Sequence, residues 1–268
     1  MRFYWAYFKL KFITGLQYRA SAIAGLSTQF FFGLINILVY IAFYESSKTT
    51  STPINLTALA TYIWLNQAFY ALIFMQYKDA EIVKMIKDGN LAYELVRPKN
   101  LYFMWYFKIY SERMAMVTLR CVPVVLITIL VPAPYGLSLP ISSSAFLLAV
   151  LTLIIGSILV TAIITLYHVL LMWTLDERGI VNVFATAANI LSGVVVPIPF
   201  FPKTLRAITN CLPFRYVSDL PFRIYSGDIP LDEGLQGLII QFIWIFIIII
   251  VGYILSEKAL KKAVIQGG

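Results

Sequence analysis

Charged residues are scarce in this sequence. Asp, Glu, Lys and Arg make up 13% of the 268 residues, whereas a soluble domain carries about 25%. Apolar residues make up 60%, and the mean hydropathy is +0.81. Since no stretch is polar enough to form a soluble domain, we expect one all-α membrane domain over residues 1–268.

Sequence signatures of catalysis are missing as well. No glycine-rich loop ending in Gly-Lys-Ser/Thr occurs, so the chain is not expected to bind ATP in the usual way. His-Glu-x-x-His and Gly-x-Ser-x-Gly are absent, and Cys121 and Cys211 form neither a disulfide framework nor a zinc signature. The one histidine, His168, has no acidic residue in its span, so we expect it to hydrogen-bond a neighbour. We therefore expect no enzyme, metal or cofactor in this chain.

The net charge of +8 does not indicate nucleic-acid binding. Phosphate recognition needs a basic face on a soluble fold. The basic residues here lie mostly in short segments beside apolar runs, where anchoring at a membrane surface explains them.

Six apolar stretches are long enough to cross a bilayer, which needs about 20 residues. They are approximately Ala20–Tyr44, Leu56–Tyr77, Met114–Pro132, Ile141–Trp173, Ile180–Val196 and Leu235–Leu255. The fifth is the weakest because it contains Asn182 and Asn189 and runs into Pro197. With both termini inside, fifteen Lys and Arg residues fall on the cytoplasmic side and five outside. The positive-inside rule therefore predicts cytoplasmic termini.

The first 19 residues do not have the pattern of a cleaved signal peptide. They mix four basic residues with seven aromatic ones and lack an uninterrupted apolar core. Basic and aromatic residues together favour a helix that lies in the headgroup layer. We expect an interfacial helix over residues 1–19.

A charged cytoplasmic loop is expected over Lys78–Arg113. Ile82, Met85 and Ile86 recur at helical spacing, and Gly89 is placed to end the helix in a left-handed cap. A further turn stops at Arg97–Pro98, because the residue before proline resists the helical conformation. One interpretation is a solvated loop on the membrane surface, and the other is an amphipathic helix that docks a cytoplasmic partner.

In its order of parts, the chain resembles the permease subunit of a type-2 ATP-binding-cassette (ABC) exporter. The pattern Ile86, Gly89, Leu91, Leu95, Arg97 and Pro98 is similar to the loop after the second span in the tandem-permease branch of that family. The resemblance implies that this loop is the coupling helix for a separate ATPase subunit, which would bind ATP and Mg²⁺. The implied contact residues are Ile82, Met85, Ile86, Lys87, Gly89, Leu91, Leu95, Arg97 and Pro98, with a minor second contact at Asp176, Glu177 and Arg178.

The external segment 197–234 holds six of the twelve prolines. Phe201, Leu205, Ile208 and Leu212 lie at helical spacing, so either a short re-entrant helix or an ordinary external loop fits. In the resembled family, this position holds re-entrant helices that close the pathway. The candidate gate residues are Pro199, Phe201, Leu205, Leu212, Pro213 and Phe214.

Arg120 is a charge within the third span, and such residues are candidates for function. Arg120 lies only seven residues after Arg113, so its side chain can instead snorkel to the cytoplasmic interface. We favour this second interpretation.

The hypothesis is a permease subunit that pairs with a second copy or a paralogue and exports an amphiphilic, peptide, antibiotic or lipid-like cargo. The resemblance implies a multi-pass protein of a bacterial or archaeal plasma membrane. The alternatives are an ion-coupled secondary transporter, which the absence of acids well inside the spans disfavours, and a membrane sensor or immunity subunit. The sequence leaves the cargo, the direction of transport and the type of dimer open.

Overall fold

The computed structural model describes residues 2–46, 52–91, 99–174 and 179–262. Within these ranges every regular element is a helix. Three helices are long and apolar enough to cross a membrane: Ala22–Ser46 within α2 (Arg19–Ser46), α8 (Ser143–Thr174) and α12 (Leu231–Lys262). Among the described residues, these three helices correspond to the first, fourth and sixth predicted spans.

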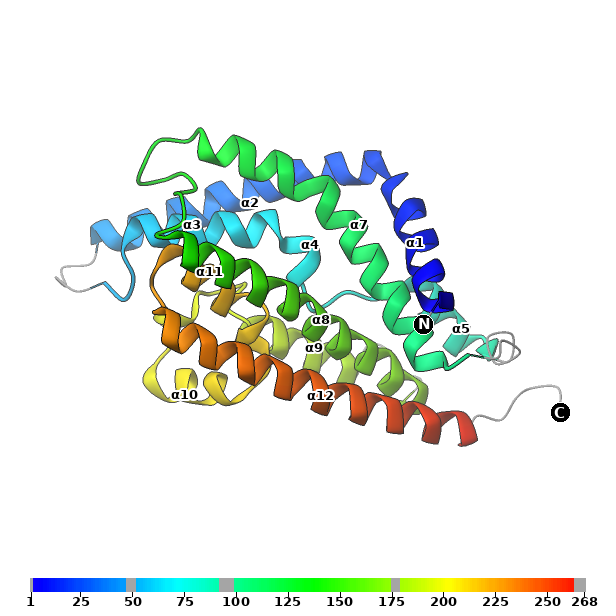
Figure 1. Ribbon diagram of the computed structural model, residues 1–268. Coiled ribbons are helices and arrows are strands. Elements are labelled where there is room, and N and C mark those ends of the chain that lie inside the picture. The colour runs from blue at the N-terminus through cyan, green and yellow to red at the C-terminus, as the bar shows by residue number, and fades with distance from the viewer. Residues whose placement is uncertain (1, 47–51, 92–98, 175–178, 263–268) are drawn as a thin grey trace.

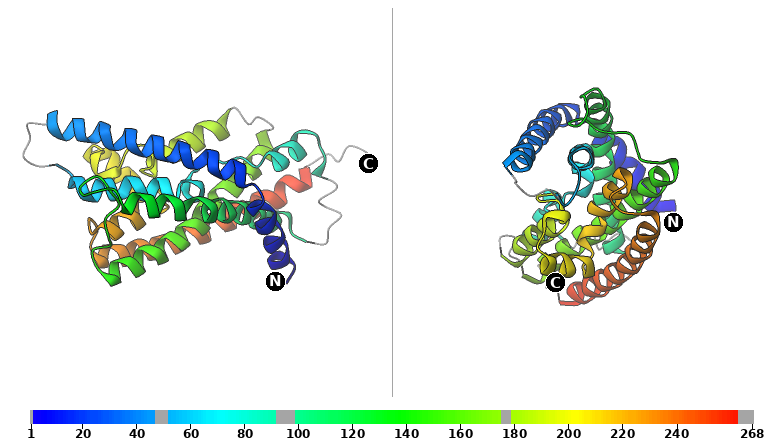
Figure 2. Two further views of the ribbon diagram at one scale, coloured as in Figure 1. Left: turned by 90° about the horizontal axis from the view of Figure 1, so that it is seen from above. Right: turned by 90° about the vertical axis from the view of Figure 1, so that its left-hand side faces the viewer.

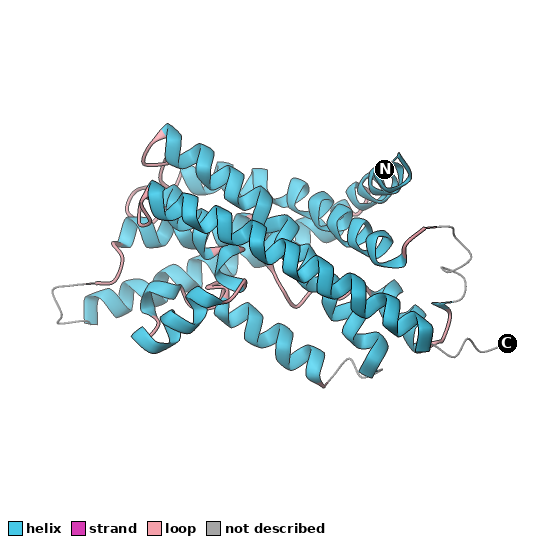
Figure 3. Ribbon diagram, turned by 60° about the horizontal axis from the view of Figure 1, so that its bottom comes forward, coloured by secondary structure: helices cyan, strands magenta, loops and turns pink. Residues whose placement is uncertain are grey.

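The bundle has two distinct ends (Figure 1). One end holds α1 (Arg2–Leu16), α5 (Ala80–Lys87) and the C-terminal end of α12. Figure 3 likewise shows the marked N and C ends toward the same side of the bundle. The opposite end holds the turn between α7 (Leu101–Ile129) and α8, together with α10 (Lys203–Cys211) and α11 (Asp219–Ser226). The chain therefore groups the segments predicted to be cytoplasmic at one end and those predicted to be external at the other.

α8 forms the centre of the fold. It packs against α12, α7, α11, α5 and α9 (Ile180–Leu191), and Leu159, Val160 and Ile164 on it are fully buried. A Cβ at Gly156 would lie 3.1 Å from the carbonyl oxygens of Tyr216 and Val217. Glycine at this position thus lets the backbone that precedes α11 cross α8 closely.

The second predicted span is not one continuous helix. α3 (Leu56–Ala68) ends at Phe69, and a single turn, α4 (Tyr70–Ile73), is followed by extended backbone at Phe74. A buried side chain explains the end of α4: the Arg113 guanidinium donates a hydrogen bond to the Leu72 carbonyl, which the next helical turn would otherwise use.

The boundaries of two further predicted segments also differ. α7 begins at Leu101, so residues 101–113 of the predicted loop are the first half of a long helix. The fifth predicted span yields only α9, whose 12 residues rise about 18 Å at about 1.5 Å each, less than the about 30 Å of a hydrocarbon core.

α1 is a separate helix that leaves α2 at an angle and lies beside α7 (Figure 2). Its rings contact α7: Tyr4 and Phe107 have their ring centroids 5.5 Å apart, and Phe8 and Tyr110 have theirs 5.8 Å apart. None of its residues is buried. Its predicted place in the headgroup layer remains a prediction.

Candidate functional site

α5 is anchored to the bundle through the residue that caps it. Asp79 Oδ1 accepts hydrogen bonds from the backbone N–H groups of Glu81 and Ile82, both at 3.0 Å, which satisfies two free donors of the first turn. The same carboxylate faces Lys108 of α7, whose Nζ lies 2.6 Å from each of its oxygens. The cap of α5 is therefore also its bridge to a long helix.

Two more carboxylates surround the Lys108 ammonium. Its Nζ lies 2.7 Å from Glu81 Oε2 and 3.9 Å from Glu112 Oε1. Burial alone raises the pKa of Asp79, but the charge and hydrogen bonds of Lys108 outweigh it and hold the pKa below its usual 3.8. The hydrogen bond from Lys108 likewise lowers the pKa of Glu81. Asp79 and Glu81 are thus ionised at neutral pH, whereas burial and the charge of Asp79 raise the pKa of Glu112.

His168 connects α5 to α8. Its Nε2 accepts a hydrogen bond of 3.0 Å from the backbone N–H of Asp79, and its Nδ1 lies 2.8 Å from the Ile164 carbonyl oxygen. An accepting Nε2 places the proton on Nδ1, which then donates to the carbonyl. His168 bonds its neighbours, as its sequence context predicted.

The apolar face of α5 packs against its own chain. Ile82 and Ile86 are buried and Met85 is half-buried, and α5 contacts α8. These three residues hold α5 against the bundle, so their predicted contact with a partner remains a prediction, and the opposite face of the helix points outward. That face exposes Lys84, Lys87, Asp88, Gly89 and Asn90.

The predicted left-handed cap at Gly89 is confirmed, with φ at +70°. The Asn90 N–H donates to the Met85 carbonyl at 3.0 Å and the Gly89 N–H to Ile86 at 3.4 Å, which is the Schellman pattern. Leu91 is half-buried. The other predicted contact residues, Leu95, Arg97, Pro98, Asp176, Glu177 and Arg178, lie outside the described residues.

The segment after α9 turns back into the bundle through η1 (Ile198–Phe200), α10, η2 (Phe214–Tyr216) and α11. Pro199, Phe201, Pro213 and Phe214 are buried, whereas Leu205 and Leu212 are half-buried. Ile208 of the predicted stripe is 52% exposed. The six candidate gate residues therefore belong to one packed unit, and their role as a gate remains a prediction.

Gln241 of α12 fastens this unit to the long helices. Its Nε2 donates to the Tyr216 carbonyl at 2.6 Å and to the Thr152 carbonyl of α8 at 2.8 Å. Sequence reasoning missed this residue because Gln241 is a single amide in an apolar run.

Two buried charged residues are not recognisable from the hydropathy pattern. Lys108 lies within the predicted loop Lys78–Arg113, and Asp219 lies within the predicted external segment 197–234. Asp219 is fully buried, with its Oδ2 3.3 Å from Arg223 Nη1 and 3.6 Å from Arg215 Nη2. The i, i+4 spacing of these arginines about Asp219 was the available signal.

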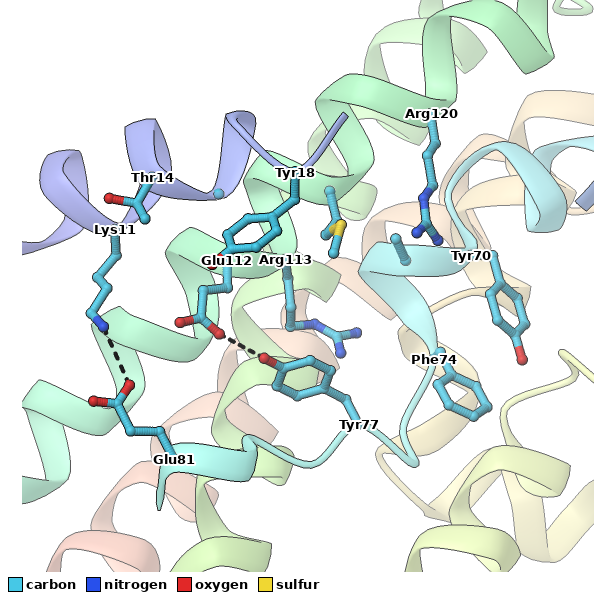
Figure 4. A pocket seen from close by; sticks show the side chains of 13 residues that line it. Lys11, Thr14, Tyr18, Tyr70, Phe74, Tyr77, Glu81, Glu112, Arg113 and Arg120 are labelled. Carbon is cyan, nitrogen blue, oxygen red and sulfur yellow. Dashed lines mark hydrogen bonds and ion pairs between the residues drawn. The ribbon is translucent and has the colours of Figure 1, made fainter. Parts of the chain in front are cut away.

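Two adjoining cavities open beside α7. One, of about 500 Å³, extends from Lys11 and Glu81 past Tyr77 and Arg113 to Tyr70 and Arg120 (Figure 4). The second, of about 370 Å³, shares Tyr70 and Arg120 with it and continues along α2. The Arg120 side chain thus lies where the two cavities meet, and its snorkelling to the interface remains a prediction.

In the described part of the chain, no group of three or more His, Cys, Asp or Glu residues is placed to hold a metal ion. Long apolar helices of this kind are typical of an integral membrane protein. Residues 30–267 match the family model described as ABC-2 family transporter protein, so the chain belongs to this family. It is therefore a membrane permease subunit and not a catalytic one. No curated protein and no solved structure matched the chain significantly.

Proposed function

We propose that this chain is the transmembrane subunit of an ATP-driven exporter, with ATP and Mg²⁺ bound by separate ATPase subunits. Family membership supports the permease role. The lack of a phosphate-binding Gly-Lys-Ser/Thr loop in the sequence supports hydrolysis on another polypeptide.

The observation that carries the proposal is the anchoring of α5. This helix lies at one end of the bundle with a charged outer face, while Asp79 connects it to Lys108 of α7 and His168 of α8. An ATPase that pushes on Lys84, Lys87 and Asp88 would move two long helices at once. Buried, paired charges suit such transmission because breaking them is costly.

The charge distribution supports a cytoplasmic location for this end. α1, α5 and the C-terminal end of α12 carry Lys9, Lys11, Lys84, Lys87, Lys258, Lys261 and Lys262, as the positive-inside rule expects of cytoplasmic segments. The segment 197–229 would then lie on the external side and act as the gate. A second copy or a paralogue would complete the pathway for an amphiphilic cargo.

A pull-down from native membranes tests the docking role of α5. The double variant Lys84→Glu, Lys87→Glu is expected to lose at least about tenfold of the co-purifying ATPase, because two favourable charge contacts become repulsive. The matched control, Lys258→Glu, Lys261→Glu, changes the net charge equally at the same end of the bundle. Equal losses in both variants would contradict docking through α5.

Reconstituted vesicles separate the proposal from its rival. Cargo transport is expected only when the ATPase and ATP are present. Transport by the purified chain alone, driven by an ion gradient, would identify a secondary transporter instead.

A further inference from the structure

The cavity along α2 is lined by polar side chains that an apolar span would not need. Gly25, Gln29, Phe32 and Asn36 repeat at helical spacing and face the cavity. Gln67 of α3 and Asn189 of α9 face it from the other side. Three separate helices thus bring amide groups to one space.

Two of these amides carry polar atoms that have no hydrogen-bond partner within the described part of the chain. Gln29 is 4% exposed, and neither its Nε2 nor its Oε1 has a hydrogen-bond partner among the described residues. Asn189 is 7% exposed, and its Oδ1 is unpartnered in the same sense. A buried polar atom without a hydrogen bond is destabilising. These atoms therefore call for a ligand or water that both donates and accepts hydrogen bonds.

Arg120 provides the positive charge of this cavity. It is the charged residue among those that line it, and its guanidinium lies against Gly25 of α2, where an added Cβ would overlap it. Glycine at position 25 thus allows the cation to lie directly beside the α2 backbone. In apolar surroundings, such a cation attracts an anionic group strongly.

The rest of the lining is apolar. Phe32, Val194 and Val195 border the cavity, and the exposed Val39 follows Phe32 at helical spacing on the same face of α2. A ligand that fills both parts has an anionic, hydrogen-bonding head and an apolar tail.

We propose that this cavity binds the head of an anionic amphiphile, with Arg120 pairing its charge and Gln29 and Asn189 bonding its polar atoms. This deepens the proposed function, since it rests on that function for the assignment of the ligand as cargo. Binding itself requires neither ATP nor the ATPase, so it is measurable even if docking through α5 fails.

The test uses a long-chain 2-hydroxy carboxylic acid that carries a diazirine, because its hydroxyl donates and its carboxylate accepts hydrogen bonds. The corresponding 1,2-diol is the alcohol used as the neutral probe. The purified full-length chain is held in phosphatidylcholine nanodiscs, and labelled peptides are mapped by mass spectrometry. We expect saturable labelling of peptides from α2 and α9 by the acid and at least about tenfold less by the alcohol. Equal labelling by both probes, or no labelling of these helices, would overturn the proposal.

Variants locate the site. Arg120→Gln and Gln29→Leu are expected to weaken the acid's apparent affinity about tenfold or more, and Gly25→Ala should act similarly by displacing the guanidinium. Lys203→Gln, an exposed change on α10, serves as the control. Should Arg120→Gln fail to fold, Gln29→Leu and Gly25→Ala still decide the question. Unchanged affinity in both would show a cavity filled by water only.

Competition identifies the source of the ligand. Millimolar inorganic phosphate or acetate that displaces the probe completely would indicate a small-anion site and contradict the amphiphile. If phosphatidylglycerol in the nanodiscs suppresses labelling, the site is supported and takes bilayer lipid. If labelling persists in phosphatidylglycerol, the site is supported and takes a soluble amphiphile.

Discussion

The Nζ atom of Lys108 lies 2.6 Å from both carboxylate oxygens of Asp79, and both side chains are almost fully buried. This pair connects the N-cap residue of α5 to the N-terminal part of α7. Glu81 of α5 also reaches this lysine directly, with its Oε2 2.7 Å from the Lys108 Nζ.

Replacing Lys108 should release α5. In Lys108→Met the Asp79 carboxylate is left buried without its cation, which costs about 3–5 kcal/mol. We expect a lower unfolding temperature in detergent and faster amide hydrogen exchange over residues 80–87. Lys84→Met, an exposed change on α5, should leave both unchanged. Equal exchange in the two variants would show that the pair does not anchor the helix.

Acid should weaken the same connection only at low pH. Because the pKa of Asp79 in the folded chain lies below its usual 3.8, its stabilisation is fully present above that value and is lost as the pH falls through the lowered pKa. Burial and Asp79 raise the pKa of the neighbouring Glu112 carboxyl, so the comparison is made in a Glu112→Gln background. There, the effect of Asp79→Asn on the unfolding temperature should stay constant from about pH 8 to about pH 5. A difference that changes within this range would contradict the lowered pKa.

The left-handed backbone at Gly89 should decide which substitutions this position tolerates. At a φ of +70°, alanine costs about 1–2 kcal/mol, whereas asparagine adopts this conformation more readily. Gly89→Ala is expected to fray the end of α5 in hydrogen exchange, and Gly89→Asn to fray it less. Equal effects would indicate that side-chain size, and not backbone strain, governs this position.

Removing the amide of Gln241 should loosen the segment 197–229 from α8. Gln241→Leu leaves the Tyr216 carbonyl without its donor, at a cost of about 1–3 kcal/mol. Limited proteolysis after α9 should accelerate. Gln236→Leu, an exposed change on the same helix, is the control and should behave as wild type.

The sequence alone predicted the elements that depend on local pattern. The apolar runs that became α2, α8 and α12 are long enough for a membrane whatever their neighbours are. Gly89 ended α5 as predicted, because few other residues adopt a left-handed backbone without strain. The family was also recognisable from the order of the parts and the short motif around Ile86 and Gly89.

Only the tertiary structure decided where contacts between distant residues override local pattern. The Arg113 guanidinium donates a hydrogen bond to the Leu72 carbonyl, and the second predicted span ends there as a helix. The residues that follow Leu72 are mostly apolar, so hydropathy does not predict this end. The sequence places Lys108 in a solvated loop. In the fold, Asp79 and Glu81, more than twenty positions away in the sequence, surround its ammonium group. Gln29, Asn189 and Arg120 come together only when three helices pack. Hydropathy reports how well one segment partitions out of water. Whether a polar side chain is buried depends instead on hydrogen-bond and charge partners that are distant in the sequence.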